Sequence, residues 1–165
     1  MPEIKQFQDH RRVFVETLDE LARTDKSIVC LIPDVGFNYL SDPNLNFPVI
    51  NLGVTEQSTI MVAVGLALSG FKVYVYSMIP FVLFRPYEMV RNGIVHHDAN
   101  VKLLGVKGAS SYAFLGFSHN MNNETEDVDA CSNLGLDSFV PASNEEVRKV
   151  ILETYQSDKP CYIRL

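Results

Sequence analysis

The sequence lacks the marks of a metal-binding, disulfide-rich or nucleic-acid-binding protein. Its 3 cysteines form no C-x-x-C pair and have no histidine partner at metal spacing, and their odd number fits a reducing compartment. We expect Cys30, Cys131 and Cys161 to be packing residues. The net charge is -6 and the basic residues are scattered along the chain, which argues against a general nucleic-acid surface.

The sequence also lacks an apolar leader and a membrane-spanning run. The N-terminal stretch MPEIKQFQDHRR is polar. The longest uncharged run, residues 57–71, is too short and too interrupted by glycine to cross a bilayer. We therefore expect a cytoplasmic protein with neither membrane nor nucleic acid as partner. No repeat, low-complexity tract or linker is visible, so 165 residues with 47% apolar content predict one domain, residues 1–165.

Strand-like and helix-like segments alternate along the chain. Short apolar runs predict strands over 27–32, 49–52, 73–76, 101–106 and 162–165. Helical spacing predicts helices over 8–23, 58–67, 84–96, 126–134 and 143–156. Ser143 and Glu146 form a capping-box pattern at the start of the last helix. The alternation predicts an α/β fold: a three-layer sandwich with a mostly parallel sheet.

Four segments directly follow predicted strands and should meet at one edge of the sheet, where ligands of such sheets bind. They are Asp34 and residues 53–56, 77–84 and 107–119. Glu56 is unusual because it is a single acid at the start of a mostly apolar helix. A buried carboxylate needs a partner or a chemical task, since burying it uncompensated is costly. The alternative is an acid stabilised only by the helix dipole.

Residues 47–77, FPVINLGVTEQSTIMVAVGLALSGFKVYVYS, resemble the pyrimidine-binding domain of transketolases and related thiamine diphosphate enzymes. In that family a G-x-x-E-Q helix start supplies the glutamate that activates the cofactor. Further blocks resemble the family in the same order: RRVFVE at 11–16, IPDVG at 32–36, PASNEEV at 141–147 and PCYIRL at 160–165. The resemblance covers nearly the whole chain and implies the thiamine diphosphate-binding, pyrimidine-domain fold.

The resemblance implies roles for five residues at the cofactor. Glu56 would act catalytically by hydrogen-bonding the aminopyrimidine, and an acid in an apolar pocket favours the neutral form that can share a proton. Phe81, Phe84 and Tyr87 resemble an F-x-x-F-x-x-Y run that packs on the pyrimidine ring. An aromatic stripe that only fills the core is the alternative. Asp34 would reach the cofactor across a subunit contact, or is only a turn former.

Three residues are candidates for contact with the substrate. Arg11 resembles a family arginine that binds a substrate phosphate, with Arg12 a near alternative and a solvated helix charge the other reading. His119, in the segment GFSH, resembles a histidine that contacts substrate oxygens, and is a second catalytic candidate. The alternative for His119 is an ordinary surface residue. Lys107 could hold a phosphate as a point charge.

The family's diphosphate site is missing. No G-D-G occurs, and Asn122-Asn123 lacks the upstream acid of the family's metal-binding segment. We therefore expect no metal ligands in this chain. A diphosphate-binding transketolase subunit or domain would hold Mg2+ and complete the thiamine diphosphate site, in a homodimer or heterotetramer. The helix over 58–67 has Ala63, Gly65 and Ala67 at close-approach spacing, so we expect it to pack against a partner copy or subunit.

The resemblance implies a transketolase-like enzyme that moves a two-carbon ketol unit between sugars or sugar phosphates. The chain stops where the pyrimidine domain stops, so a separate subunit and an excised piece both remain open. One rival is a component of a 2-oxo acid decarboxylase or dehydrogenase. Another is a non-catalytic interaction domain that retains the fold. The sugar is left open because residues 120–126 lengthen the loop after His119.

Overall fold

The computed structural model of the chain describes residues 9–35, 37–107 and 114–165. In chain order the elements are α1 (His10–Ala22), β1 (Ile28–Ile32), α2 (Phe37–Leu40), β2 (Val49–Asn51), α3 (Glu56–Leu68), β3 (Lys72–Met78), η1 (Pro80–Phe84), α4 (Tyr87–Met89), η2 (Val90–Val95), β4 (Val101–Val106), η4 (Phe117–His119), α5 (Glu126–Leu134), β5 (Asp137–Phe139), α6 (Asn144–Gln156) and β6 (Cys161–Arg164). None of the described helices combines the length and apolarity needed to cross a membrane.

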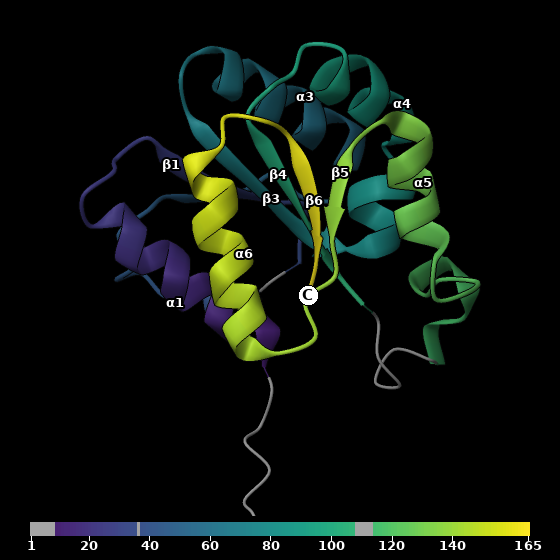
Figure 1. Cartoon of the computed structure of the whole chain (residues 1–165), viewed down its shortest axis with the longest axis horizontal. Coiled ribbons are helices and arrows are strands. Elements are labelled where there is room, and N and C mark those ends of the chain that lie inside the picture. The colour runs from purple at the N-terminus through teal and green to yellow at the C-terminus, as the bar shows by residue number, and fades with distance from the viewer. Residues whose placement is uncertain (1–8, 36, 108–113) are drawn as a thin grey trace, which may run out of the picture.

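The strands form one six-stranded sheet in the order β2-β1-β3-β4-β6-β5, and every strand pairing among the described residues is parallel. Helices α1 and α6 cover one face of this sheet, while α3, α4 and α5 lie on the other (Figure 1). The predicted three-layer α/β sandwich is therefore confirmed. Helices on both faces explain why β1, β3 and β4 are nearly continuous apolar runs.

Each face of the sheet has its own apolar core. Under α1 and α6, Phe14 stacks on Tyr76 of β3 with ring centroids 6.0 Å apart. Under α3, Ile60 and Val64 pack against β1, β3 and β4, and the ring of Tyr162 belongs to the same cluster. The three cysteines are free and buried within these cores, as expected of packing residues. Burial raises the pKa of the Cys131 thiol to about 12.

The segment after β3 differs most from the sequence-based prediction. A helix was expected over 84–96, but helical structure begins at Pro80 and consists of two π-type turns, η1 and η2, around the short α4. Pro86 has no backbone N–H, which interrupts an ordinary helical ladder here. The backbone N–H of Arg85 instead bonds to the carbonyl of Pro80 at 2.8 Å, a five-residue step. Such π turns often accompany functional sites.

Three smaller differences concern elements or contacts that leave weak sequence signals. β5 and α2 were not predicted, because each is short and carries no clear periodicity. The cap of α6 confirms Ser143, whose Oγ accepts from the Glu146 N–H at 3.2 Å, but the Glu146 carboxylate accepts from the Ala142 N–H. The predicted irregular loop over 108–123 includes the single turn η4, and its residues 108–113 lie outside the described part of the chain.

Gly105 of β4 should tolerate no larger residue. A Cβ at this position would come within 2.4 Å of the Tyr162 hydroxyl, and that phenol is fully buried and bonded to Asp127. We expect Gly105→Ala to lower the free energy of unfolding by about 1–3 kcal/mol through overpacking, measured by urea titration. Gly65→Ala is the matched control in α3, where nothing lies within 4 Å. This control should gain about 0.5–1 kcal/mol from helix propensity, so equal stability of the two variants would contradict the close packing.

Candidate functional site

The carboxyl ends of the strands meet at one edge of the sheet, which also receives the start of α1 and the C-terminus (Figure 1). Asn51, at the end of β2, ties two turns of this edge together. Its Oδ1 accepts from the backbone N–H of Asp34 at 3.1 Å and of Gly53 at 2.9 Å. Asp34 and Gly53 both have positive φ values, 60° and 71°. Asp tolerates this left-handed region and Gly adopts it freely, so both turns suit their sequences.

Glu56 is the first residue of α3 and is almost completely buried, with 4% of its surface exposed. The turn at Gly53 delivers the chain to the helix start, and Thr59 Oγ1 bonds back to the Thr55 carbonyl at 3.0 Å. The positive end of the helix dipole favours an acid at this position. The carboxylate also forms an ion pair with Nη1 of Arg85. Its surroundings are therefore less apolar than the sequence suggested.

Four side chains from three segments form what we call the Glu56 cluster: Glu56, Phe81, Arg85 and His119. The guanidinium carbon of Arg85 lies 4.0 Å from the centroid of the Phe81 ring, as a cation–π pair. The His119 ring meets Phe81 edge-on, with centroids 4.9 Å apart and planes 81° apart. Ser118 Oγ lies 3.0 Å from Nδ1 of His119. The structure thus brings three of the predicted residues, Glu56, Phe81 and His119, into one cluster.

The π turn of η1 explains how Arg85 reaches this cluster. Arg85 caps this turn four residues after Phe81, a spacing that places both side chains on one side of a helical turn, and the guanidinium lies over the Phe81 ring. The two other predicted aromatic residues lie along the same segment. Phe84 is half-buried and packs against the core beneath α3, and Tyr87 is half-buried at the start of α4. Phe84 therefore contributes to the core, as in the alternative reading of the aromatic run.

The remaining predicted site residues make contacts of their own. Arg11 Nε lies 3.4 Å from Asp9, whose carboxylate also accepts from the Tyr39 hydroxyl of α2. Asp34 is exposed in the turn that Asn51 holds. Lys107 forms an ion pair with the exposed Glu124. These three lie in segments at the carboxyl edge, outside the Glu56 cluster.

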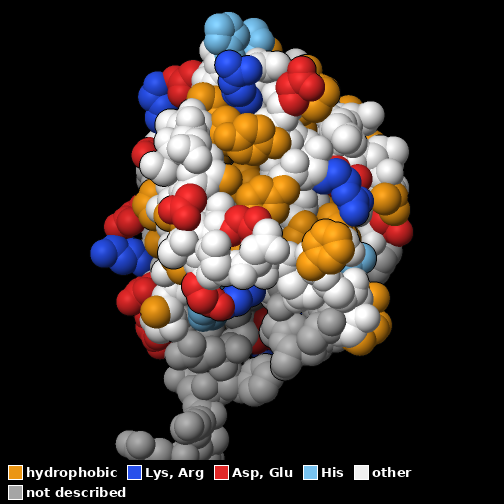
Figure 2. All heavy atoms as spheres, turned by 90° about the vertical axis from the view of Figure 1, so that its right-hand side faces the viewer, with side chains coloured by type: hydrophobic (Ala, Val, Ile, Leu, Met, Phe, Trp, Pro, Cys, Tyr) orange, Lys and Arg blue, Asp and Glu red, His pale blue; other side chains and the backbone are white. Residues whose placement is uncertain are grey.

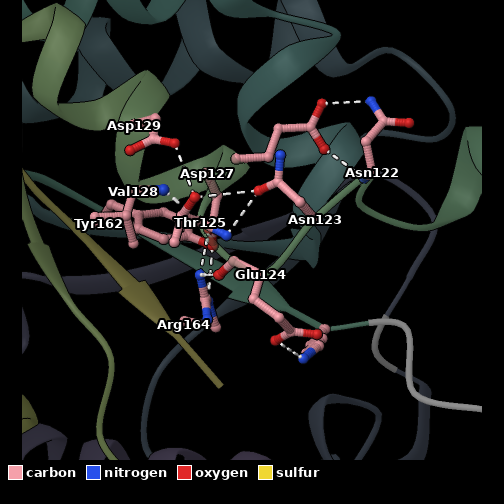
Figure 3. A network of polar contacts seen from close by, with 11 residues as sticks. Asn122, Asn123, Glu124, Thr125, Asp127, Val128, Asp129, Tyr162 and Arg164 are labelled. Carbon is pink, nitrogen blue, oxygen red and sulfur yellow. Dashed lines mark hydrogen bonds and ion pairs between the residues drawn. The ribbon is translucent and has the colours of Figure 1, made fainter.

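The loop that carries His119 is fastened at its far end by a buried ion pair (Figure 3). Asp127 at the start of α5 is 0% exposed and accepts from Arg164 Nε at 2.9 Å and from the Tyr162 hydroxyl. Arg164 also donates to the Glu124 carbonyl at 2.9 Å. The backbone between η4 and α5 is thereby tied to the last strand of the sheet.

Electrostatics favour the ionised form of this pair. Burial by itself raises the pKa of Asp127, but the hydrogen bonds from Arg164 and Tyr162 outweigh it and hold the pKa below its ordinary value. The hydrogen bond to Asp127 raises the pKa of Arg164. Two fully satisfied charges can be buried at acceptable cost, whereas one alone cannot. The described residues include no group of three or more His, Cys, Asp and Glu side chains placed to hold a metal ion.

Four residues that shape the candidate site were missed from the sequence. Arg85 stands four residues after Phe81 in an aromatic run, a spacing that brings side chains together on a helix and could have been noticed. Asn51 is the last residue of β2, and an Asn at a strand end commonly accepts a hydrogen bond from the backbone two residues further on, as it does here from Gly53. The Asp127–Arg164 pair joins distant segments, and no local pattern indicates it.

Fold and site together define a class: an α/β sandwich with a parallel sheet, whose carboxyl edge carries a buried acid paired with an arginine that lies over an aromatic ring. Within this class, the family described as "Transketolase, pyrimidine binding domain" matches residues 8–165. The chain belongs to this family, which confirms the resemblance seen in the sequence.

Two curated relatives carry transketolase names. The chain is 32% identical over 159 residues to an apulose-4-phosphate transketolase subunit of Phocaeicola vulgatus, covering 94% of this chain and 50% of that protein. It is 28% identical over 159 residues to the 6-deoxy-6-sulfo-D-fructose transketolase subunit SqwH of a Clostridium species, covering 94% and 48%. The chain spans about half the length of these curated relatives.

Solved structures agree with the fold. A split-gene transketolase, described as an inactive beta4 tetramer, superposes with a TM-score of 0.77 at 26% identity, covering 94% of this chain and 50% of that one. Transketolase of Campylobacter jejuni gives a TM-score of 0.80 at 15% identity, covering 95% and 25%. The second likeness supports the fold alone.

Removing the charge of Asp127 should destabilise the protein and change its response to acid. Because the folded pKa is lowered, the carboxylate's contribution is complete above the unfolded value of about 3.9 and is lost as pH falls through the folded value. We expect Asp127→Asn to cost about 3 kcal/mol at pH 7, by leaving Arg164 buried without its counter-charge.

The measurement is chemical denaturation at a series of pH values from neutral to acid. The variant should show a flatter acid limb than the unaltered chain. Asp129→Asn, on the same helix but exposed, is the matched control and should stay within about 0.5 kcal/mol at every pH. A similar loss in both variants would refute a special role for the buried pair.

Proposed function

We propose that this chain supplies the pyrimidine-binding part of a thiamine diphosphate-dependent, transketolase-like enzyme. The single observation that carries the proposal is the cluster at the carboxyl edge of a parallel sheet, in which the buried Glu56 pairs with Arg85, Arg85 lies over the Phe81 ring, and His119 meets that ring. Family membership and the names of the relatives support it. In this proposal the enzyme transfers a two-carbon ketol unit between sugars or sugar phosphates.

The donor set fits the aminopyrimidine of thiamine diphosphate. Glu56 would offer its carboxyl group, carrying the shared proton, as a donor to a ring nitrogen, and Phe81, aided by Phe84 and Tyr87, would offer apolar surface to a flat heterocycle. Near the carboxyl end of β3, Ser77 is fully buried and its Oγ has no hydrogen-bond partner among the described residues, so a polar atom remains unpaired at this end of the strand. When bound, the cofactor supplies the carbanion-stabilising chemistry.

The chain's own residues would orient the cofactor and move protons. Glu56 Oε1 would hold or share one proton with the bound heterocycle, in a place that is shielded from water. His119 would donate to substrate oxygens from the rim of the cluster, at the end of η4. Lys107 and Arg11 would act as charges for a phosphate group, and Asp34 would face the cofactor from the turn after β1. Glu124, which pairs with Lys107, would then have to give way to the phosphate.

A second polypeptide or domain would hold the diphosphate and Mg2+. The related split-gene transketolase, an inactive tetramer of beta chains, fits an enzyme that needs another component. Helix α3 supports the idea of a partner, because it is apolar all round: its inner face meets the sheet, while Met61, Val62 and Leu68 are 49%, 40% and 63% exposed. Gly65 on this face leaves room for close approach. We propose that this face packs against a partner copy or subunit.

Glu56→Gln tests the catalytic role. Gln keeps the shape of the side chain but can neither carry the charge nor exchange the proton. With the partner subunit, Mg2+ and thiamine diphosphate present, we expect ketol transfer to fall by about 100- to 10,000-fold. Glu88→Gln, an exposed acid in α4, is the matched control and should keep full activity.

The same assay separates the rival functions. Decarboxylation of pyruvate without ketose cleavage would favour a 2-oxo acid component. Full biological activity in Glu56→Gln, with assembly intact, would favour a non-catalytic interaction domain. Either result would overturn the transketolase proposal.

The exposed face of α3 gives a separate test of assembly. We expect Leu68→Asp to weaken association with the partner by at least tenfold, because a charge would be buried in an apolar contact. Sedimentation velocity of the mixed subunits measures this. Leu152→Asp on α6, which covers the opposite face of the sheet and is 37% exposed, should assemble normally. Figure 2 shows that apolar side chains are also exposed between charged groups on the side of α4 and α5. Normal assembly of Leu68→Asp would contradict the role of α3 and would favour that side as the partner-binding face.

A further inference from the structure

We infer that Arg85 is a built-in stand-in for the cofactor's aminopyrimidine, which occupies the ring's place until the cofactor displaces it. The inference rests on the function proposed above, and it concerns a residue to which that function gives no part. If this is so, the Arg85 side chain blocks the cofactor site in the free protein, and the cofactor binds by taking the place of that side chain.

The contacts of Arg85 are the two that a bound aminopyrimidine would need. Its guanidinium carbon lies 4.0 Å from the centroid of the Phe81 ring, and its Nη1 forms an ion pair with Oε1 of Glu56. One contact is with a flat aromatic ring and the other is with the buried carboxylate. Both partners are therefore taken by a single side chain.

The chemistry of the two groups is alike. A guanidinium is planar and delocalised, stacks on aromatic rings and presents N–H donors along one edge. An aminopyrimidine is also planar and presents a ring nitrogen beside an amino group. A planar group of this shape can lie on the Phe81 ring and reach Glu56 with a nitrogen along its edge.

The arginine also meets a need of the cofactor-free protein. Glu56 has a side chain that is only 5% exposed, and an uncompensated charge there would be costly. Arg85 supplies the counter-charge while its own side chain remains 40% exposed. It can therefore swing into water when another donor takes over Glu56.

The backbone beneath Arg85 is held in place, so the exchange needs only a side-chain movement. The Arg85 N–H is bonded to the Pro80 carbonyl at 2.8 Å, and Pro86 follows in the chain. A site whose competent form is only partly populated binds its ligand more weakly by that fraction. Arg85 should therefore lower the affinity for the cofactor and slow its entry.

The test compares Arg85→Met with the unaltered chain, each assembled with the partner subunit and Mg2+. Methionine keeps a long apolar side chain and removes the guanidinium. Calorimetry and stopped-flow mixing give the affinity and association rate of thiamine diphosphate. We expect tighter binding by roughly tenfold and faster association, since couplings of this kind are commonly 5- to 150-fold. Arg91→Met, an exposed arginine on η2, is the control and should bind as the unaltered chain does.

A second variant guards against loss of folding and tests the mimicry directly. Arg85→Ala with added ethylguanidinium restores the missing group as a free molecule. We expect ethylguanidinium to compete with thiamine diphosphate in Arg85→Ala and to have no effect on the unaltered chain. The cofactor-free variants should also melt at a lower temperature and regain the loss when thiamine diphosphate binds.

The outcomes separate the two ideas. Unchanged or weaker cofactor binding in both Arg85 variants, with normal binding by the unaltered chain, would overturn the stand-in and leave the proposed function intact. Absence of ethylguanidinium competition in Arg85→Ala would also overturn it. Failure of every assembled form to bind thiamine diphosphate would remove the proposed function, and the stand-in with it.

Discussion

A carboxylate buried at the start of an apolar helix is the constraint on which the rest of the site depends. Glu56 is 4% exposed, so its charge must be met by something inside the protein. In the chain by itself Arg85 meets it, supported by the face of Phe81. The buried Glu56 would still need a polar partner if Arg85 moved away, and a flat nitrogen heterocycle could be that partner. Binding and folding thus draw on one interaction.

The parallel sheet determines which segments lie close enough to Glu56 to contribute to the site. All its carboxyl ends lie on one edge, so the turn before α3, the π turn after β3 and the loop ending at η4 converge although they are far apart in sequence. Arg85 lies over the Phe81 ring, and His119 meets the same ring edge-on. The buried Asp127–Arg164 pair anchors the loop of His119 to β6, so the precision of the site depends partly on a contact remote from it.

Periodicity and apolar runs were sufficient to predict the sandwich. Strands β1, β3 and β4 are buried on both faces, so nearly every residue in them must be apolar, and this pattern is visible in the sequence. Glu56 could be singled out since an acid in an apolar helix is rare, and Phe81 and His119 by resemblance. The four-residue spacing of Arg85 from Phe81 was a usable signal, but nothing in the sequence indicates that Arg85 also pairs with Glu56. β5 escaped notice because it is a three-residue edge strand containing Asp137 and Ser138. Asp127 and Arg164 meet only through the tertiary fold.

Helix α3 connects the site to assembly. Its first residue is Glu56, and its outer face exposes Met61, Val62 and Leu68 one to three turns further on. A helix is stiff over this length, so a partner seated on that face would fix the position of the carboxylate as well. An apolar outer face is a liability in a free chain and an advantage only in an assembled one. Helix α3 would therefore serve two purposes in the proposed two-polypeptide site: the acid at its start would meet the cofactor, and the apolar surface along its side would meet the partner.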